Sequence, residues 1–431
     1  MVDFRKVRAT AREGAWVVLG QAASILGSLF LVRTLTEHLG TAQYGELSLG
    51  LTVVSLVNQV VMAGILATIT RHYAIAMEER SFPLYRAAAG SLMQRATLVV
   101  VVVGGLVLVG LVASRRWQYI LLTLGALVYA LLSTYNAAFN GIQNASRRRA
   151  SVAFHGALDA WLKIALVVLA VRVLGGSSQV VVSAYAAASL VVLASQFRQF
   201  RQTHPLQDEQ PTRDGFAYWR KRMRDFSMPF AIWGGFTWAQ QVTDKWSLLA
   251  FGTVDEVGRY AVLYQLGYSP VVVIGGVLML FLSPIFFQRS GNASDASRNR
   301  SVHHLGWRVA LASLMFTVLA SGAAWAFHEL IFRTFVAASF SEVSGYLPLV
   351  VAAGGLFTSG QFFALKLYSE LQSKRMVLAN TVSASAGVAM NVIGAWLFGL
   401  NGVVGALIGY ALIYFLWMAW LATHRHEGVS L

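Results

Sequence analysis

Long apolar stretches follow one another along almost the whole chain, separated by short polar segments. A helix that crosses the ~30 Å hydrocarbon core of a bilayer needs about 20 mostly apolar residues. No charged residue lies between Arg375 and Arg425, and Gly399–Gly402 supplies a turn that divides this stretch into two spans. The pattern therefore predicts an all-α integral membrane protein with about twelve transmembrane helices, at residues 14–35, 46–70, 89–113, 117–140, 152–174, 179–197, 227–250, 260–286, 306–330, 345–368, 376–398 and 402–421.

The basic residues lie mainly in every second connection between these spans. Lysine and arginine are enriched in the cytoplasmic loops of membrane proteins. Of the 34 lysines and arginines, three lie within spans (Lys163, Lys245 and Lys366), and six fall on the side opposite to the majority: Arg33, Arg115, Arg116, Arg172, Arg259 and Arg333. This distribution predicts that both termini are cytoplasmic, and that the basic segment Met1–Glu13 precedes a retained first helix and is not part of a cleaved signal peptide.

Two turns of similar sequence indicate an internal repeat. Residues 39–47 and 251–260 both contain an apolar residue, Gly-Thr, a short polar stretch and a glycine that opens the next helix. Because each half holds an even number of spans, the two halves share one orientation, and parallel repeats are related by a pseudo-twofold axis along the membrane normal. We expect two parallel six-helix lobes: an N-terminal lobe at 1–198, a cytoplasmic linker at 199–225 and a C-terminal lobe at 226–431.

Composition excludes several functional classes. The chain is 56% hydrophobic and 12% charged, too little polar surface for a soluble protein of 431 residues. The net charge is +15, and the basic residues lie in the loops and form no stripe. We therefore interpret the charge as a signal of membrane topology that also attracts anionic lipids. We expect no nucleic-acid partner. The absence of cysteine excludes thiolate metal sites and thiol chemistry.

Cations within the predicted spans are candidates for substrate binding, because ionisable residues in a membrane usually face a cavity or a partner. Arg33 and Lys245 each lie seven residues before the glycine of the repeated turn, which predicts equivalent depths in the two halves. Facing each other across a central cleft, they would suit a pyrophosphate. The alternatives are that Arg33 reaches the outer headgroups and that Asp244 neutralises Lys245.

Two further clusters carry ionisable side chains at helical spacing. His155, Asp159 and Lys163 follow one another at intervals of four and form one polar stripe. The stripe could be an Asp159–Lys163 pair that lowers the insertion cost, or it could line a cavity, with His155 sensitive to protons. Lys366 is four residues before Glu370 and is the deeper of the two, which makes it the better cavity candidate. The predicted substrate-binding residues are thus Arg33, Lys245, Lys163 and Lys366, and the candidates for ion coupling are Asp159, His155 and Asp244.

Motifs of the common membrane-associated enzymes are absent. The chain contains no Gly-x-x-x-x-Gly-Lys phosphate loop, no nucleophile elbow and no His-Glu-x-x-His. The outer loops are also short. We therefore expect a protein that is not an enzyme, with no catalytic residues, no cofactor and no metal site.

Several loose motifs distributed over the whole chain resemble one family of membrane proteins. These motifs are Leu31–Leu35, Tyr44–Leu49, Arg71, Phe139–Gly141, Asp244–Trp246, Val257–Tyr260 and Gly399–Ala406. In these residues the chain resembles polysaccharide-export flippases of the multidrug/oligosaccharidyl-lipid/polysaccharide superfamily.

This resemblance implies a fold like that of the multidrug exporters, a function and a location. Members of the family move an oligosaccharide on polyprenyl pyrophosphate, such as an O-antigen or exopolysaccharide repeat unit, from the inner to the outer leaflet through a cationic central cavity. Arg33 and Lys245 match the cavity cations by position. The implied location is the bacterial cytoplasmic (inner) membrane. The implied partners are the lipid-linked oligosaccharide, membrane lipids, and a polysaccharide polymerase and glycosyltransferases.

A cation-coupled multidrug exporter of the same fold is the alternative function. Such an exporter needs an uncompensated acid in the first helix of a half, but the first span has none and Asp244 has Lys245 beside it. Asp159 is the residue that keeps this alternative open. An enzyme that polymerises or ligates lipid-linked glycans is disfavoured by the short outer loops. A major-facilitator sugar transporter is disfavoured because the loop from Arg71 to Arg86 lacks the Gly-Asp-Arg pattern of that family.

Overall fold

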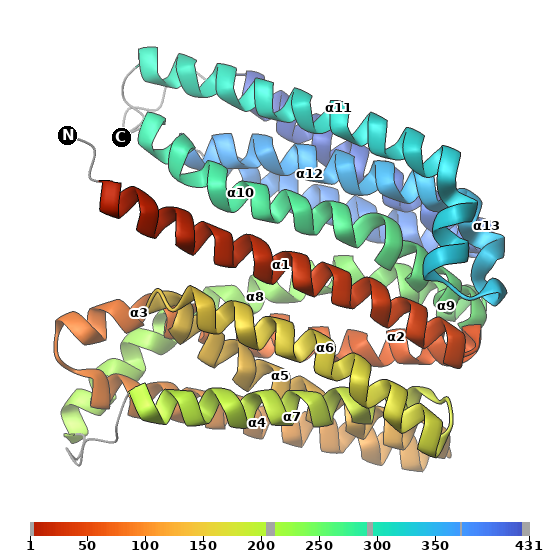
Figure 1. Ribbon diagram of the computed structural model, residues 1–431, viewed down its shortest axis with the longest axis horizontal. Coiled ribbons are helices and arrows are strands. Elements are labelled where there is room, and N and C mark those ends of the chain that lie inside the picture. Colours follow the sequence, from red (N-terminus) through yellow and green to blue (C-terminus); the bar gives the residue numbers. More distant parts are fainter. Residues whose placement is uncertain (1–3, 204–211, 291–295, 371–372, 425–431) are drawn as a thin grey trace. The chain divides into compact units, whose positions relative to one another are not determined.

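A computed structural model describes the chain except for residues 1–3, 204–211, 291–295, 371–372 and 425–431. In the described part every regular element is helical (Figure 1). The elements are α1 (Phe4–His38), α2 (Thr41–Leu56), η1 (Val57–Met62), α3 (Ala63–Glu78), α4 (Phe82–Ala113), η2 (Trp117–Tyr119), α5 (Ile120–Ala145), α6 (Arg149–Leu174), α7 (Ser178–Thr203), α8 (Arg213–Phe251), α9 (Val254–Leu263), η3 (Tyr264–Tyr268), α10 (Ser269–Ser290), α11 (Ala296–Phe335), η4 (Ala338–Tyr346), α12 (Leu347–Ser369) and α13 (Ser373–Thr423).

Each predicted span lies inside a helix or a run of consecutive helices. By length and composition, eight helical segments of the described chain are long and apolar enough to cross a membrane, which makes this a multi-pass membrane protein. These segments are Thr41–Glu78, Phe82–Ala113, Trp117–Ala145, Ser178–Thr203, Val254–Ser290, Arg300–Phe335, Ala338–Ser369 and Met376–Thr423. The last of them contains two predicted spans, joined at Gly399, whose φ of 57° breaks the helical path.

The contacts divide the chain into two compact units. Unit 1 comprises residues 1–39 and 46–238, and unit 2 comprises residues 40–45 and 239–431. The predicted linker 199–225 is largely helical where it is described, because α7 continues to Thr203 and α8 begins at Arg213. The polar segment 204–211, which the charge pattern predicts to be cytoplasmic, lies outside the described residues, as does the C-terminal Arg425.

In unit 1, α1 packs along α6, and α5, α6 and α7 lie side by side (Figure 1). Small residues allow the close approach of α1 and α6. A Cβ on Gly20 would lie 3.0 Å from the Cβ of Ala153, and one on Gly27 would lie 3.1 Å from that of Ala160. Such small-residue contacts are the usual way in which helices pack in a membrane, where lipid tails remove most of the hydrophobic driving force.

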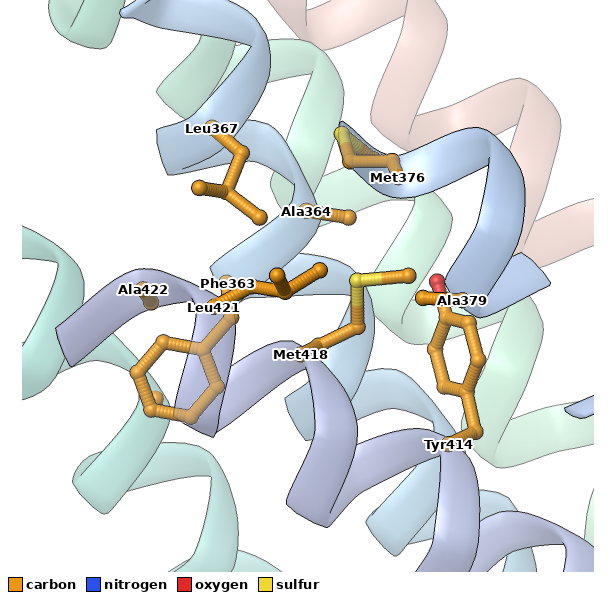
Figure 2. Close-up of a cluster of buried hydrophobic side chains, with 10 residues drawn as sticks. Phe363, Ala364, Leu367, Met376, Ala379, Tyr414, Met418, Leu421 and Ala422 are labelled. Atoms are coloured by element: carbon orange, nitrogen blue, oxygen red, sulfur yellow. The ribbon is translucent and has the colours of Figure 1, made fainter. Parts of the chain in front are cut away.

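In unit 2, α11, α12 and α13 run side by side (Figure 1). The two halves of α13 fold back on each other at the turn at Gly399, and Gly394 and Gly402 bring the two backbones into direct contact. The ends of α12 and α13 enclose a cluster of buried apolar side chains that Figure 2 shows in detail. The cluster contains Ala310, Phe363, Ala364, Leu367, Met376, Ala379, Tyr414, Met418, Leu421 and Ala422.

The two repeated turns meet within unit 2, which includes Gly40–Gly45 together with α9. The hydroxyl of Thr41 donates to the carboxylate of Asp255. A Cβ on Gly45 would collide with the carbonyl oxygen of Val254, and a Cβ on Gly258 would collide with that of Thr41. Only glycine therefore allows the two turns to approach so closely.

A wide helical turn occurs beside Pro270, a residue that by itself predicts a kink in its span. The π-helical segment η3 lies immediately before this proline, so that α10 begins at Ser269. A π turn accommodates an extra residue and is frequent at functional positions. A second π segment, η1, interrupts the helix that runs from α2 to α3 and has no proline that would have revealed it.

Candidate functional site

Arg33 lies near the end of α1 in unit 1 and forms an ion pair with Glu37. The guanidinium nitrogen is 2.6 Å from the Glu37 carboxylate, and the two side chains are 35% and 44% exposed. The pair follows from the helix, because residues four apart lie on one face. Glu37 was missed in the sequence, although the i, i+4 spacing was visible.

Lys245 and Asp244 lie near the end of α8, in unit 2. Asp244 is buried, and its two carboxylate oxygens accept hydrogen bonds from the Tyr260 hydroxyl at 2.8 Å and from the Lys245 backbone N–H at 2.7 Å. The ammonium of Lys245 lies 5.5 Å from the ring centre of Tyr264, a cation–π distance. Tyr264 in turn stacks on Tyr268 at 4.7 Å within η3.

The ammonium of Lys245 thus differs from the other intramembrane cations. Among the described ion pairs, those of Arg33, Lys163 and Lys366 each include an acid four residues away, whereas none includes Lys245. The neighbouring Asp244 carboxylate accepts a hydrogen bond from the Tyr260 hydroxyl of α9, and it interacts with the charge of Lys245 at longer range. No pattern in the sequence signals this contact, which joins two helices.

Asp159 and Lys163 form the expected pair in α6, with 2.5 Å between the ammonium and the carboxylate. Two tyrosines complete the surroundings of this ammonium. Tyr129 of α5 lies 5.1 Å from it and Tyr185 of α7 lies 5.8 Å from it, both measured to the ring centre. Lys163 is therefore held by three helices of unit 1, while the Asp159 side chain is 31% exposed.

His155 lies one turn before Asp159 and is buried between α6 and α7. Its Nδ1 is 2.9 Å from the carbonyl oxygen of Ser151, and its Nε2 is 3.2 Å from the hydroxyl of Ser195. Because a carbonyl oxygen only accepts, Nδ1 must carry the proton, and Nε2 of the neutral ring accepts from Ser195. The stripe predicted from the sequence is thus present, and it faces α5 and α7.

Lys366 lies inside unit 2 and is only 2% exposed. Its ammonium is 3.2 Å from the Glu370 carboxylate and donates to the carbonyl oxygen of Ala422 at 2.7 Å. Ala422 belongs to the buried apolar cluster of Figure 2, which also contains Ala364 and Leu367 from the same helix as Lys366. Lys366 therefore ties α12 to the last turn of α13, and its predicted role in substrate binding stays a prediction.

The structure thus brings His155, Asp159 and Lys163 together in unit 1, and Asp244 and Lys245 together in unit 2. Arg33 belongs to unit 1 and Lys245 to unit 2. Tyr129, Tyr185 and Tyr260 were missed from the sequence, because aromatic residues in apolar helices are far more often packing residues than binding residues. Among the residues that the structure describes, no group of three histidine, aspartate or glutamate side chains could hold a metal ion.

Solved structures with a similar fold are transporters and flippases. A multidrug resistance MATE family transporter of the MOP superfamily, in an inward-facing conformation, matches with a TM-score of 0.66 and 12% identity over 94% of this chain and 98% of its own. The lipid II flippase MurJ, in an inward closed conformation, matches with a TM-score of 0.67 and 10% identity over 96% of this chain and 88% of its own. The Vibrio cholerae MATE transporter VcmN, in a bent form, matches with a TM-score of 0.57 and 15% identity over 96% of this chain and 97% of its own.

At these identities the likeness establishes the fold, and the sequence family comes from a separate finding. No curated protein sequence matches this chain at a significant level. A family model described as "Polysaccharide biosynthesis protein" matches residues 10–290, which is more than half of the 431 residues. The chain therefore belongs to the polysaccharide biosynthesis protein family, whose fold it shares with transporters and flippases.

Proposed function

We propose that this protein is a flippase that moves a polyprenyl-pyrophosphate-linked oligosaccharide from the inner to the outer leaflet by alternating access through a cationic central cavity. One observation carries the proposal: the ammonium of Lys245 lies in a predicted span and belongs to none of the described ion pairs. A cation in a membrane is stabilised by a partner of opposite charge. A pyrophosphate would be that partner.

Tyr260 is central to this interpretation. Its hydrogen bond occupies one oxygen of Asp244, and the backbone N–H of Lys245 occupies the other. The carboxylate is thereby satisfied without the Lys245 side chain. The aromatic face of Tyr264 supports the ammonium and leaves its N–H groups able to donate to an anion.

The acids beside the candidate cations support an anionic cargo over a cationic one. Asp159 is paired with Lys163, Glu370 is paired with Lys366, and Asp244 is engaged by Tyr260. A cation-coupled drug exporter needs an acid that is free to bind the coupling ion or the drug. Asp159, which kept that alternative open, is compensated by the lysine one turn away.

The proposed roles follow from these surroundings. Arg33 and Lys245 bind the pyrophosphate, Arg33 with its planar fork and Lys245 as a point charge. Lys163 contributes positive potential from unit 1. The two proposed lobes have six helices each. The proposed location is a bacterial inner membrane, with both termini on its cytoplasmic side. The proposed functional partners are the glycosyltransferases that make the lipid-linked glycan and the polymerase that consumes it. The protein acts as a transporter and carries out no reaction on its cargo.

Binding of a polyprenyl pyrophosphate to the purified full chain in lipid nanodiscs tests the proposal. Lys245→Ala is expected to weaken binding about tenfold or more, equivalent to ~1.4 kcal/mol, because the anion loses a charge-assisted donor. Lys245→Arg keeps the charge and is expected to retain most of the affinity. Lys221→Ala, which removes an exposed cation outside the predicted spans, serves as the matched control.

The same measurement separates the two candidate functions. Polyprenyl pyrophosphate that binds equally well to wild type and Lys245→Ala would contradict the assignment of Lys245. Efflux of a cationic dye from cells that produce the protein, abolished by Asp159→Asn and unaffected by Lys245→Ala, would favour the multidrug exporter instead.

A further inference from the structure

A groove of about 400 Å³ lies on the helical hairpin of α13 in unit 2, apart from the residues proposed to bind the pyrophosphate. Its lining comes from the first half of α13, between Met390 and Phe398, and from the second half, between Asn401 and Ala406. Apart from Asn401, every lining residue is apolar or a glycine. The turn of the hairpin is at the end that the charge pattern predicts to face outward, so the groove belongs to the outer half of the predicted bilayer.

Glycines form the floor of this groove. Gly394 and Gly402 bring the backbones of the two halves together, which leaves the space beside this contact without side chains to fill it. One turn further along, a Cβ on Gly405 would find no atom within 4 Å, and this glycine is exposed. The methyl group of Met390 lies against Gly409 and limits the groove toward the inner half of the bilayer.

The groove opens onto the surface of unit 2 that the sequence predicts to face lipid. No charged residue lies between Arg375 and Arg425, and the helical segment Met376–Thr423 is long and apolar enough to cross a membrane. Ile393 and Phe398, which line the groove, are 53% and 68% exposed. The occupant must therefore be an apolar group that is present in or beside the bilayer.

The volume of the groove distinguishes a helix from a lipid chain. A transmembrane helix is about 10 Å across with its side chains, so that 400 Å³ would hold roughly 5 Å of its length, or one turn. A hydrocarbon chain is about 4–5 Å across, given the ~4 Å separation of carbon atoms in contact. The same volume holds roughly 20 Å of such a chain, enough to follow the whole ~15 Å depth of one leaflet.

The outer mouth of the groove carries a hydrogen-bond donor. The Tyr346 hydroxyl, at the end of η4, donates to Oδ1 of Asn401. In the described part of the chain no hydrogen bond uses the Asn401 amide nitrogen, so its two N–H groups are free to donate to an acceptor outside the protein. A phospholipid has this polarity, because its ester carbonyl oxygens accept hydrogen bonds at the head end of each acyl chain.

We propose that this groove is a binding site for a phospholipid of the outer leaflet. One acyl chain occupies the space between the two halves of α13, and an ester carbonyl oxygen accepts a hydrogen bond from the Asn401 amide. The chain fills the volume that Gly405 leaves open, so that the bound lipid stabilises the hairpin. Binding is non-covalent and needs no cargo, and a failure of this site leaves the roles proposed for Arg33 and Lys245 untouched.

The chemistry of the lining favours a phospholipid over the tail of a polyprenyl pyrophosphate. No lining residue carries a charge, whereas a pyrophosphate is best bound by Arg or Lys. The neutral amide of Asn401 is matched by a neutral ester carbonyl. A polyprenyl chain also carries methyl branches along its length, which make it wider than an acyl chain and a poorer fit to the narrow floor at Gly394 and Gly402.

Photocrosslinking measures where a bound lipid lies. The full chain is placed in nanodiscs of phosphatidylethanolamine and phosphatidylglycerol that contain a phospholipid with a diazirine on its acyl chain. After transfer to a mild detergent, which removes loosely held lipid, irradiation and peptide mass spectrometry locate the label. We expect at least fivefold more label in residues 390–406 than in residues 98–112 of α4, where Leu98, Leu106 and Val109 are equally exposed to lipid. Equal labelling of the two segments overturns the proposal.

Two substitutions in the groove and one outside it complete this experiment. Gly405→Leu places a side chain in the groove at a position without a steric conflict, and we expect it to reduce the label in residues 390–406 at least fivefold. Asn401→Leu removes the donor at the mouth and is expected to reduce the label severalfold. Gly276→Leu in α10, equally exposed and with no atom within 4 Å of its Cβ, is the matched control and is expected to keep the label. Undiminished labelling in Gly405→Leu contradicts the site.

Thermal unfolding in detergent identifies the source of the chain. Added phosphatidylglycerol is expected to raise the unfolding midpoint of the wild type and of Gly276→Leu by a few degrees, because a ligand that binds only the folded state stabilises it. No such rise is expected for Gly405→Leu, and an equal rise in this variant contradicts the proposal. Polyprenyl phosphate that displaces the phospholipid label from residues 390–406 would assign the groove to the tail of the cargo and overturn the assignment to a phospholipid.

Discussion

Two ion pairs of this protein share the i, i+4 spacing on a helix but differ in how deeply they are buried. Arg33–Glu37 lies partly exposed near the end of α1, whereas Lys366–Glu370 is enclosed by the ends of α12 and α13. The geometry of the pair comes from the helix in both cases. The surroundings decide its effect, because the cost of removing one partner rises steeply as the other becomes buried.

The buried pair of unit 2 provides a test of this difference. Lys366→Met leaves the Glu370 carboxylate buried without its cation, so we expect a loss of about 3–5 kcal/mol of stability. The double variant Lys366→Met with Glu370→Gln removes both charges and is expected to recover much of that loss. Thermal unfolding of each purified variant in detergent measures its loss of stability relative to the wild type. A double variant less stable than the single variant would show that the charges are not coupled.

The hydrogen bond from Tyr260 to Asp244 is the second residue-scale prediction. Tyr260→Phe removes the donor and leaves one carboxylate oxygen buried without it, which we expect to destabilise unit 2 by about 1–3 kcal/mol. The Lys245 ammonium is then expected to turn toward the carboxylate, so that affinity for a polyprenyl pyrophosphate falls. Tyr368→Phe, at an exposed position of α12, is the control. Unchanged stability and binding in Tyr260→Phe would contradict the role given to this hydroxyl.

At the scale of the elements, helices and turns pack closely where one of them carries a glycine. α1 meets α6 at Gly20 and Gly27, and the halves of α13 meet at Gly394 and Gly402. The turn Gly40–Gly45 meets α9 through Gly45 and Gly258, the two glycines that correspond in the repeated motif. In each place a backbone or a small side chain occupies the volume that a Cβ would need, so that the helix positions depend on these residues.

The contact at α9 gives the prediction for this scale. Gly258→Ala forces the new methyl group against the carbonyl oxygen of Thr41, and we expect a loss of about 1–3 kcal/mol of stability from overpacking. Gly276→Ala in α10, where no atom lies within 4 Å of the added Cβ, is expected to be neutral. Thermal unfolding of the two variants, measured under the same conditions, tests this prediction. Equal unfolding midpoints would mean that the turn at Gly40–Gly45 shifts without a loss of stability.

At the scale of the whole molecule, the distribution of basic residues predicts how the chain lies in the membrane. The chain has no cysteine, so that a single engineered cysteine can be labelled without background. Ser114 lies at the end of α4 on the predicted outer side, and Thr212 lies directly before α8 on the predicted cytoplasmic side, both exposed.

Labelling of spheroplasts with a membrane-impermeant maleimide tests the predicted orientation. Ser114→Cys is expected to react in intact spheroplasts, and Thr212→Cys is expected to react only after permeabilisation, since the excess of lysine and arginine marks the cytoplasmic side. The reverse labelling pattern would show that the topology is opposite to the predicted one. Labelling of both sites in intact spheroplasts would place them on the same side.

The sequence by itself determined the all-helical membrane class and several local pairs of this protein. Apolar runs of about 20 residues must become helices in a bilayer, because no other element satisfies the backbone of a single span there. The break at Gly399 and the Asp159–Lys163 and Lys366–Glu370 pairs follow from the same local geometry. Such features depend on residues that are close together along the chain.

Contacts between distant residues were decided only by the tertiary structure. Tyr260 engages Asp244 from another helix, Tyr129 and Tyr185 enclose Lys163 from two others, and the α5–α7 register aligns Asn140 with Gln196. A membrane helix is apolar on most of its surface, so that its sequence does not mark which face meets a neighbour or at what register. Packing sets both, and it thereby decides which of these charged side chains form ion pairs.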